Sequence, residues 1–531
     1  MKEKTPLSTS SKSIAKAAGI LFIAGTASKV LGMVRDVATM QIFGNTPITD
    51  AYYAAFSIPD FMYLLVVGGA LSAAFIPVFT EYLAKKDEAQ AWEMATSFLV
   101  AGGLLLFGIA LLGMLFARQL APIVAYKFSG QQLDLFEGLM RLMFPAVFFT
   151  SLAGLAMGVH FSYQRFLMPA LGPVAYNVFI ITGIYLLGPR FGVRGMAVGV
   201  LLGAMASFAL QMPFVIAASK RVGASWRLDF KHPALRRVLW LMIPTSAGLG
   251  VRQLNLLVEQ NLASGMGAGA ITVIRNSTRL FQFPVDAFGA AVASAVFPVL
   301  TRQFALNDLD SFRRTFGEGI RSILFIGVPA GLGLFVLSEP IVRLLFEHGK
   351  FTTADTAVTA GTLAFYSLAV FSQAVLVLIT RAFYAIQDTR TPVKVGFILV
   401  ALGAFANIAL MYTTNLGTRG LALVFTIVSF ANFVVLSVVL KRRIGLLGGR
   451  AIARTGIKAL AAGSAMALGS WAVAMALGRM VDVTRPTGQL LQVGAAVGVG
   501  IVIYVTLAWA LRMEEVGAYW RLFRRRFVRK H

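Results

Sequence analysis

Long apolar segments recur along the whole chain and set its predicted architecture. Windows of about 20 predominantly apolar residues, the length that crosses a bilayer, follow one another with short polar breaks. A membrane β-barrel would instead show alternating segments of about 10 residues. We therefore expect an all-α, polytopic membrane protein with 14 transmembrane helices. The expected spans are residues 17–44, 50–80, 91–117, 136–162, 169–188, 195–218, 239–263, 268–301, 317–346, 356–386, 392–412, 420–440, 455–478 and 488–511.

Two pairs of motifs indicate that the chain repeats itself. The stretch SAAFIPVFTEYLAKKD (72–87) resembles ASAVFPVLTRQFALND (293–308), and HFSYQRFLMP (160–169) resembles FYAIQDTRTP (383–392). Both copies of each motif fall on the same side of the membrane, which indicates parallel repeats. The pattern predicts two pseudo-symmetric six-helix lobes around a central cavity, with the last two helices outside the duplication. This is the architecture of a transporter.

The same pattern predicts four regions along the chain. We expect an N-terminal lobe at 1–218, a basic cytoplasmic linker at 219–238 and a C-terminal lobe at 239–440. The remaining residues, 441–531, would form the last helix pair and a basic tail.

Composition supports the membrane assignment and excludes several function classes. Hydrophobic residues make up 57% of the chain and charged residues 13%, whereas soluble domains are about 25% charged. The net charge of +25 does not indicate nucleic-acid binding, because no aromatic-interleaved soluble domain accompanies it. The chain has no cysteine, no metal-ligand spacing among its four histidines and no Walker A loop. These observations predict a transporter rather than an enzyme, and argue against ATP-driven transport.

Lysines and arginines gather in the termini and in the loops that follow even-numbered spans. Such an excess marks the cytoplasmic side, so both termini are expected in the cytoplasm. The basic N-terminus leads directly into the first apolar segment, which we interpret as a retained helix rather than a cleaved signal. The C-terminal RLFRRRFVRKH (521–531) would face lipid headgroups.

Several cations lie inside the expected spans, where each costs at least about 2.5–3.5 kcal/mol. Lys29 and Arg35 occupy the first span, in SKVLGMVRD, Arg252 the seventh, and Arg275 and Arg279 the eighth. The duplication makes the first two helices of each lobe equivalent. These cations are therefore expected on helices that face each other across the central axis.

The helical spacing of these cations favours a broad cavity lining. Arg275 and Arg279 are four residues apart and share a helix face. Lys29 and Arg35 are six apart, so their directions differ by roughly 120°.

Few acids are near enough in the sequence to balance the cations. Asp36, Asp50 and Glu259 can each form an internal salt bridge, which is the alternative interpretation for any single cation. They do not neutralise the whole set. A cationic, water-filled cavity favours an anion, and the arginine fork suits phosphate, so we expect a phosphorylated substrate.

Six stretches along the chain resemble the MurJ (MviN) family of the multidrug/oligosaccharidyl-lipid/polysaccharide exporter superfamily. They are SKVLGMVRD, TDAYYAAFSIP, GALSAAFIPVFTEY, TRLFQFPVDAFGAAVASAVFPVL, FEHGKFTTAD and FYAIQDTRTPVKV. The resemblance implies a lipid II flippase of the bacterial inner membrane that uses alternating access, with a cationic cavity for the pyrophosphate. It also implies that helices 13 and 14 form a groove for the lipid tail.

The resemblance assigns substrate-binding roles to particular residues. The first-helix arginine pair of the family falls on Lys29 and Arg35, with Asp36 alongside. The cavity arginine of the eighth span falls on Arg279, and the aspartate that opens the second span falls on Asp50.

The sequence also departs from the family pattern. Lysine at position 29 keeps the charge but loses the bidentate fork. A second-span arginine of some members becomes Tyr63 or Leu64, an acid five positions on becomes Gly68, and an acid after the cavity arginine becomes Gln282. Arg252 and Arg275 would supply the missing charge.

Some relatives hold a sodium ion among spans 7, 11 and 12. By that resemblance Glu259, Asn407 and Thr426 would contribute oxygen ligands, the type that hard cations prefer. A second acid expected after Asn407 is Met411. The alternatives are an ion pair between Glu259 and a neighbouring arginine, and coupling to the membrane potential without a bound ion.

Three other functions are alternatives to lipid II export. Another polyprenyl-linked glycan flippase would use the same cationic cavity. A drug–cation antiporter would need cavity carboxylates and few arginines, and a non-transporting assembly factor would not need buried surplus charge. The expected partners are lipid II and membrane lipids, without nucleic acid. We expect a monomer near the cell-wall synthesis machinery.

Overall fold

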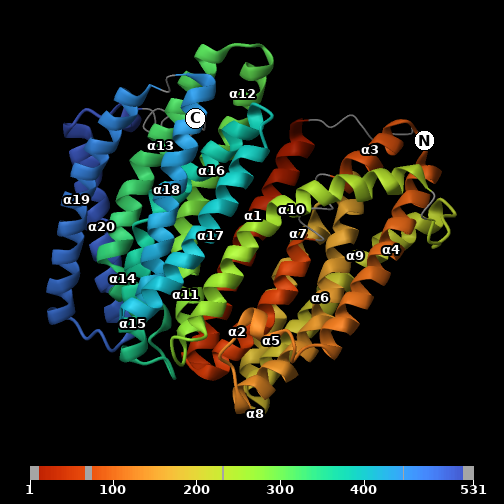
Figure 1. The fold of residues 1–531 in the computed structure, drawn as a ribbon, viewed down its shortest axis with the longest axis horizontal. Coiled ribbons are helices and arrows are strands. Elements are labelled where there is room, and N and C mark those ends of the chain that lie inside the picture. Colours follow the sequence, from red (N-terminus) through yellow and green to blue (C-terminus); the bar gives the residue numbers. More distant parts are fainter. Residues whose placement is uncertain (1–10, 66–73, 230–231, 446–447, 518–531) are drawn as a thin grey trace. The chain divides into compact units, whose positions relative to one another are not determined.

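In the computed structural model, residues 11–65, 74–229, 232–445 and 448–517 are described, apart from the side chains of 11–18 and 243–252. The chain divides into two compact units, Met1–Ile271 and Thr272–His531. The first contains α1 (Ser11–Phe43), α2 (Pro47–Tyr63), α3 (Ile76–Ala84), α4 (Glu88–Leu115), α5 (Ala121–Val124), α6 (Gly130–Ser162), α7 (Leu167–Thr182), the π-helix η3 (Gly183–Leu187), α8 (Gly188–Phe191), α9 (Val193–Arg221) and α10 (Pro233–Ala263) (Figure 1). The boundary falls in α11 (Ala270–Pro284). The second unit continues with the π-helix η4 (Val285–Ala290), α12 (Ala291–Ala305), α13 (Leu309–Val336), α14 (Ser338–Phe346), α15 (Thr353–Ser367), α16 (Val370–Ala385), α17 (Arg390–Thr413), α18 (Thr418–Ile444), α19 (Gly449–Met480) and α20 (Pro486–Ala510).

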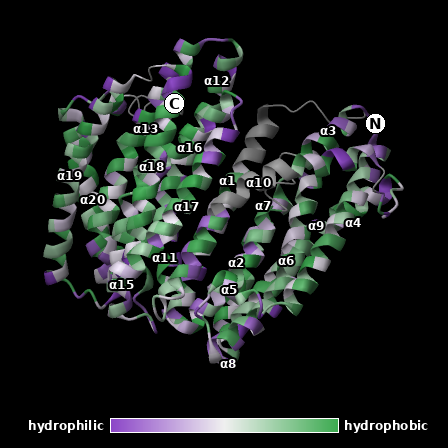
Figure 2. Cartoon of the chain, viewed as in Figure 1, coloured by the Kyte–Doolittle hydropathy of each residue, from purple (hydrophilic) through white to green (hydrophobic). Residues whose placement is uncertain are grey.

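The expected all-α membrane fold is confirmed. Within the described ranges ten helices are long and apolar enough to cross a membrane, or eleven if the bent pair α15–α16 is one span. The charged helices α1 and α10 add lengths of 33 and 31 residues. In each unit the helices are hydrophobic along most of their length, and polar residues gather near their ends (Figure 2). These elements are consistent with the fourteen predicted spans.

Two expected spans are interrupted. The segment predicted at 317–346 ends as α13 at Val336, and α14 begins at Ser338. The segment predicted at 356–386 forms α15 and α16, which are bent by 45° at their junction. Hydrophobicity alone did not reveal either break, because the apolar pattern continues through both.

The duplication is visible in how helices end. Lys86 and Asn307 adopt left-handed backbone with φ of 61° and 57°, and Gln164 and Gln387 do so with φ of 56° and 60°. Each follows a helix, and the next amide closes the turn by bonding five residues back, as Asp388 N does to Phe383 O at 2.9 Å. The four left-handed residues lie in the two motif pairs that the sequence matched.

Helix starts repeat in the same way. Asp87 accepts from the backbone N of Gln90 at the start of α4, and Asp308 does so from Ser311 at the start of α13. Gly192 and Gly417 precede α9 and α18 with φ of 61° and 55°, a region that favours glycine. The two lobes therefore share a backbone plan, as predicted.

The motif FYAIQDTRTP forms a turn between α16 and α17. The Asp388 carboxylate accepts from Thr391 N at 3.0 Å and Thr391 Oγ1 at 2.6 Å, and pairs with Arg443 at 2.9 Å. Partial burial alone would raise the pKa of Asp388, but these hydrogen bonds and the Arg443 charge outweigh it and lower the pKa. This motif has a structural role at a helix end.

Helix α10 packs with the first unit, although the duplication places it first in the second lobe. Gln260 accepts from Ser57 Oγ at 2.5 Å and donates to Val124 O at 3.4 Å, and Asn261 donates to Pro122 O at 2.7 Å. These bonds tie α10 to α2 and α5. The boundary between the two compact units therefore follows Ile271. The domain boundaries expected from the sequence stay a prediction.

Each unit has an aromatic core near one end of its helices. In the first, Phe79 meets Trp92 edge to face at 5.9 Å between ring centroids. In the second, Phe312, Phe316 and Phe383 are fully buried in one cluster.

Glycines bring α7 and α9 into backbone contact. Gly195, Gly199 and Gly203 are spaced by four residues along α9, a pattern that lets membrane helices approach closely. A Cβ on Gly199 would lie 2.8 Å from Phe179 O, and one on Gly203 would lie 2.8 Å from Tyr176 O. This contact fixes the position of α7.

Gly199→Ala should destabilise the protein by about 1–3 kcal/mol, because the added methyl overlaps a backbone oxygen that cannot move freely. Gly108→Ala in α4 is the control: its Cβ would meet nothing within 4 Å, so helix propensity alone predicts a small gain. Thermal unfolding of the purified protein in detergent measures both. Equal stability of the two variants would contradict the close contact.

Candidate functional site

Arg35 is held in place within the first unit. Its Nε and Nη2 donate to Asp36 Oδ1 at 3.0 and 2.7 Å, and its Nη1 donates to Asn177 Oδ1 at 3.2 Å. Asn177 is itself fixed, because its Nδ2 donates to Pro173 O at 2.9 Å. The Arg35 side chain is 16% exposed. The carboxylate and the amide lower the cost of placing a cation in a spanning helix.

The guanidinium retains capacity for an anion. Its three bonds to described residues use three of the five N–H donors of an arginine. The remaining donors could pair with oxygens of a phosphate. Arg35 and Asp36, both predicted from the sequence, thus form an ion pair. Asn177 completes the set of partners of Arg35, and it was not predicted from the sequence.

The structure places two other predicted residues of the first unit. Lys29 is exposed and lies about one and two-thirds turns before Arg35 on α1. Asp50 is 2% exposed, and its Oδ2 accepts from the Gly269 backbone N at 2.7 Å. Asp50 thereby joins the start of α2 to the turn before α11. The side chain of Arg252 lies outside the described residues, although its backbone belongs to α10.

The second unit carries the remaining cations, on α11. Arg275 is half-buried and Arg279 is exposed, one turn apart. Gln282, which follows Arg279 on the same helix, donates to Asp286 Oδ1 at 3.0 Å. The joint cavity of α1 and α11 cations stays a prediction.

The candidate cation ligands are all buried. Asn407 and Thr426 belong to the second unit, on α17 and α18, and each is 5% exposed. Asn407 Oδ1 has no hydrogen-bond partner within the described part of the chain, whereas Thr426 Oγ1 donates to Phe365 O at 2.7 Å. Glu259, in the first unit, is 3% exposed and accepts from Asn255 Nδ2 at 3.0 Å.

These oxygens suit a hard cation. The unpartnered amide oxygen of Asn407 and the free lone pairs of Thr426 are ligands that sodium accepts. No cluster of three or more His, Cys, Asp or Glu that could hold a metal occurs in the described ranges.

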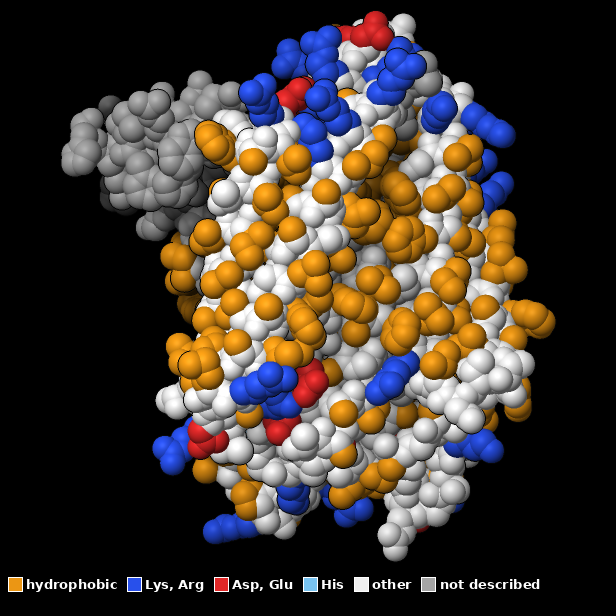
Figure 3. All heavy atoms as spheres, turned by 90° about the vertical axis from the view of Figure 1, so that its left-hand side faces the viewer, with side chains coloured by type: hydrophobic (Ala, Val, Ile, Leu, Met, Phe, Trp, Pro, Cys, Tyr) orange, Lys and Arg blue, Asp and Glu red, His pale blue; other side chains and the backbone are white. Residues whose placement is uncertain are grey.

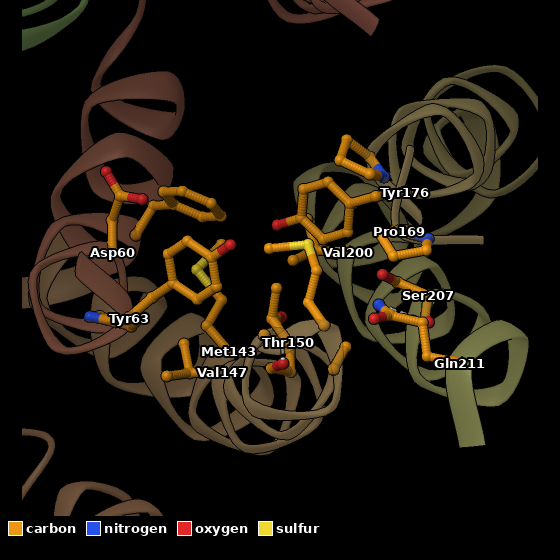
Figure 4. Close-up of a pocket in the computed structure, with 17 residues that line it drawn as sticks. Asp60, Tyr63, Met143, Val147, Thr150, Pro169, Tyr176, Val200, Ser207 and Gln211 are labelled. Atoms are coloured by element: carbon orange, nitrogen blue, oxygen red, sulfur yellow. Dashed lines mark hydrogen bonds between the residues drawn. The ribbon is translucent and has the colours of Figure 1, made fainter. Parts of the chain in front are cut away.

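A cavity of about 200 Å³ lies inside the first unit, between α2, α6, α7 and α9 (Figure 4). Phe56, Asp60 and Tyr63 line it from α2, and Tyr176 lines it from α7. Sequence reasoning marked Tyr63 only as a departure from the family pattern. The cavity combines residues from four separate helices, so no local sequence motif predicts it.

Comparisons with known proteins identify a matching family and similar relatives. A family model described as lipid II flippase MurJ matches residues 39–482. The probable lipid II flippase MurJ of Vibrio cholerae is 32% identical over 442 residues, which cover 81% of this chain and 83% of that protein. The lipid II flippase MurJ of Burkholderia cenocepacia is 30% identical over 424 residues, covering 78% and 81%.

Solved structures share the fold. A lipid II flippase MurJ in an inward closed conformation matches with a TM-score of 0.75 at 23% identity, covering 96% of this chain and 99% of that one. An inward-facing multidrug resistance MATE family transporter of the MOP superfamily matches with a TM-score of 0.69 at 15% identity, covering 79% and 95%. At these identities the likeness concerns the fold alone.

Asp50→Ala should cost about 1–3 kcal/mol of stability, because the buried Gly269 N–H loses its acceptor. Asp50→Asn should recover most of this loss, since an amide oxygen can accept the same bond. Detergent-solubilised protein followed by thermal unfolding distinguishes the two. Asp134→Ala, at an exposed carboxylate, is the control and should leave stability unchanged. Equal losses for the Ala and Asn variants would show that the charge, rather than the acceptor, stabilises this position.

Proposed function

Because the chain belongs to the lipid II flippase MurJ family, we propose that it moves lipid II from the inner to the outer leaflet of the bacterial cytoplasmic membrane by alternating access. Lipid II is the undecaprenyl-pyrophosphate-linked disaccharide pentapeptide used to build peptidoglycan. The observation that supports this proposal most directly is Arg35, oriented by Asp36 and Asn177 with donors left over. A cation kept at this cost within a span indicates a function.

The pyrophosphate is the part of the substrate that these cations would bind. Arg35 presents directed N–H donors, and Lys29 adds a point charge on the same helix. Arg275 and Arg279 of α11, with Arg252 of α10, would complete the cationic cavity once the two lobes enclose it. The chain would act as a transporter without covalent chemistry, so no catalytic residue is assigned.

The last two helices would hold the lipid tail. Together α19 and α20 present large exposed hydrophobic side chains, among them Ile457, Leu468, Trp471, Val502 and Trp509. Figure 3 shows the side of the second unit where α19 and α20 lie in Figure 1, with hydrophobic side chains over most of its height and lysines and arginines gathered along its upper edge. A long apolar chain is compatible with such a surface.

The basic edge also supports the proposed orientation. Lys441, Arg442, Arg450 and Arg454 are exposed at the facing ends of α18 and α19. By the positive-inside rule this end lies in the cytoplasm, with both termini. The protein would work as a monomer close to the enzymes that consume lipid II.

A sodium ion would couple transport to the ion gradient. Asn407 and Thr426 would supply oxygen ligands from adjacent helices, and Glu259 would contribute a carboxylate from α10. The buried, unpartnered Oδ1 of Asn407 supports this assignment. Membrane potential is the alternative energy source.

Rescue of cells depleted of their own lipid II flippase tests the proposed function. The wild-type chain should restore growth, whereas Arg35→Gln and Arg279→Gln should fail at matched expression because the cavity loses phosphate-binding charge. Arg118→Gln, at an exposed ion pair, serves as control and should rescue.

Each outcome bears on a separate part of the proposal. Rescue by both cavity variants would refute the role of these arginines. Failure of a well-expressed wild-type chain would favour a flippase for another polyprenyl-linked glycan. Binding of organic cations instead of lipid II would favour a drug–cation antiporter.

Sodium should raise the thermal stability of the purified protein relative to potassium at equal ionic strength, because a ligand that binds only the folded state stabilises it. Asn407→Leu should abolish this difference. Asn432→Leu is a matched control, since its amide oxygen is also buried without a partner among the described residues. An unchanged sodium response in Asn407→Leu would remove this residue from the site.

A further inference from the structure

The cavity of the first unit has a chemistry unlike that of the cation-bearing helices. It is lined by seventeen residues of α2, α6, α7 and α9. These lining residues include one carboxylate, Asp60, and no lysine or arginine, in a chain with a net charge of +25. A phosphate would find no cationic partner there, so the cavity suits a different part of a ligand.

Three polar side chains around the cavity have unused hydrogen-bonding capacity. Gln211 is 2% exposed and donates to Ser207 O at 3.3 Å, but its Oε1 has no partner in the described part of the chain. The hydroxyls of Tyr63 and Tyr176 make no hydrogen bond to a described residue. In Figure 4 they point toward one another across the open space. Polar groups left unpaired inside a membrane-embedded lobe are costly, which indicates that a polar ligand or water completes them.

The remaining wall is apolar and flat in places. The rings of Phe56, Tyr63 and Tyr176 and the thioethers of Met143 and Met157 line the same space. Aromatic faces combined with a few directed acceptors and hydroxyls suit a sugar ring, whose C–H face packs on the aromatic rings while its hydroxyls form hydrogen bonds. With about 200 Å³, the cavity has room for a single ring rather than for a disaccharide with its peptide.

The cavity lies directly beside the Arg35 group. Tyr176 lines the cavity, and the next residue, Asn177, accepts a hydrogen bond from Arg35 Nη1 at 3.2 Å. In a saccharide linked to a lipid through pyrophosphate, the first sugar is bonded directly to the phosphate. A phosphate at Arg35 would therefore present that sugar to a neighbouring site.

We infer that this cavity binds the phosphate-proximal sugar ring of the lipid-linked saccharide, an inference that rests on the proposed function. Gln211 Oε1 accepts a hydroxyl or acetamido N–H of the sugar. The hydroxyls of Tyr63 and Tyr176 donate to or accept from its oxygens, and Asp60 marks the exposed side of the cavity.

Two purified lipids separate the sugar site from the phosphate site. The probes are lipid II and undecaprenyl pyrophosphate, which lacks the saccharide, and the measurement is the affinity of each for the full-length protein in detergent. Gln211→Met and Tyr176→Phe should each weaken lipid II binding about three- to tenfold, the effect of one lost hydrogen bond, and leave undecaprenyl pyrophosphate binding unchanged. Arg35→Gln should weaken the binding of both lipids.

The variants are chosen to preserve the fold. Tyr176→Phe removes only a hydroxyl. Gln211→Met keeps the length of the side chain and removes the unpaired oxygen together with the amide N–H that donates to Ser207 O at 3.3 Å. Tyr412→Phe, at a tyrosine that is 81% exposed, is the matched control and should bind both lipids as the wild type does.

Equal weakening of both lipids by the cavity variants would overturn the inference, since it would indicate a structural effect. Unchanged lipid II affinity in Gln211→Met and Tyr176→Phe, with normal wild-type binding, would overturn the inference and leave the proposed function intact. Failure of the wild type to bind either lipid would overturn the proposed function and the inference together.

Discussion

The close approach of α7 to α9 is the contact on which the site in the first unit depends. Gly199 and Gly203 let the α7 backbone approach at a distance where any side chain on α9 would intrude. Helix α7 then presents two successive residues in different directions. Asn177 reaches Arg35 on α1, and Tyr176 faces the cavity. A helix held by larger side chains would stand further away, and both contacts would be lost.

Polar neighbours explain why the buried charge of Arg35 is tolerated next to this contact. Because the Arg35 side chain is only 16% exposed, neighbouring residues must supply most of its hydrogen-bond acceptors. Asp36 neutralises the charge, and the Asn177 amide orients it without adding a further charge. The result is a cation whose direction is set before any ligand arrives, an arrangement that lowers the entropy cost of binding.

The fold class could be predicted from the sequence because hydrophobic span length and the internal motif pairs are local signals. The matched stretches proved to be helix ends with left-handed residues, where Gln164 and Gln387 close equivalent turns. The bend between α15 and α16 was missed, because a continuous apolar run does not reveal a change of direction. The substrate-binding role of Asp50 stays a prediction. Its bond to Gly269 could not be predicted, because the two residues are more than two hundred positions apart in the sequence. The cavity was missed for a similar reason, since it exists only where four helices meet.

The two lobes have equivalent helix ends but differ in the middle of one helix. Helix α6 runs unbroken from Gly130 to Ser162, whereas its counterpart bends by 45° between Ser367 and Val370. By the register of the two motif pairs, the bend corresponds to Ala146 and Val147, in the part of α6 that lines the cavity. The two lobes thus share their helix ends, while one has a continuous helix where the other has a bent pair. Equivalent positions in the two halves of a duplicated chain therefore need not line equivalent sites, because one bend is enough to give the halves different internal surfaces.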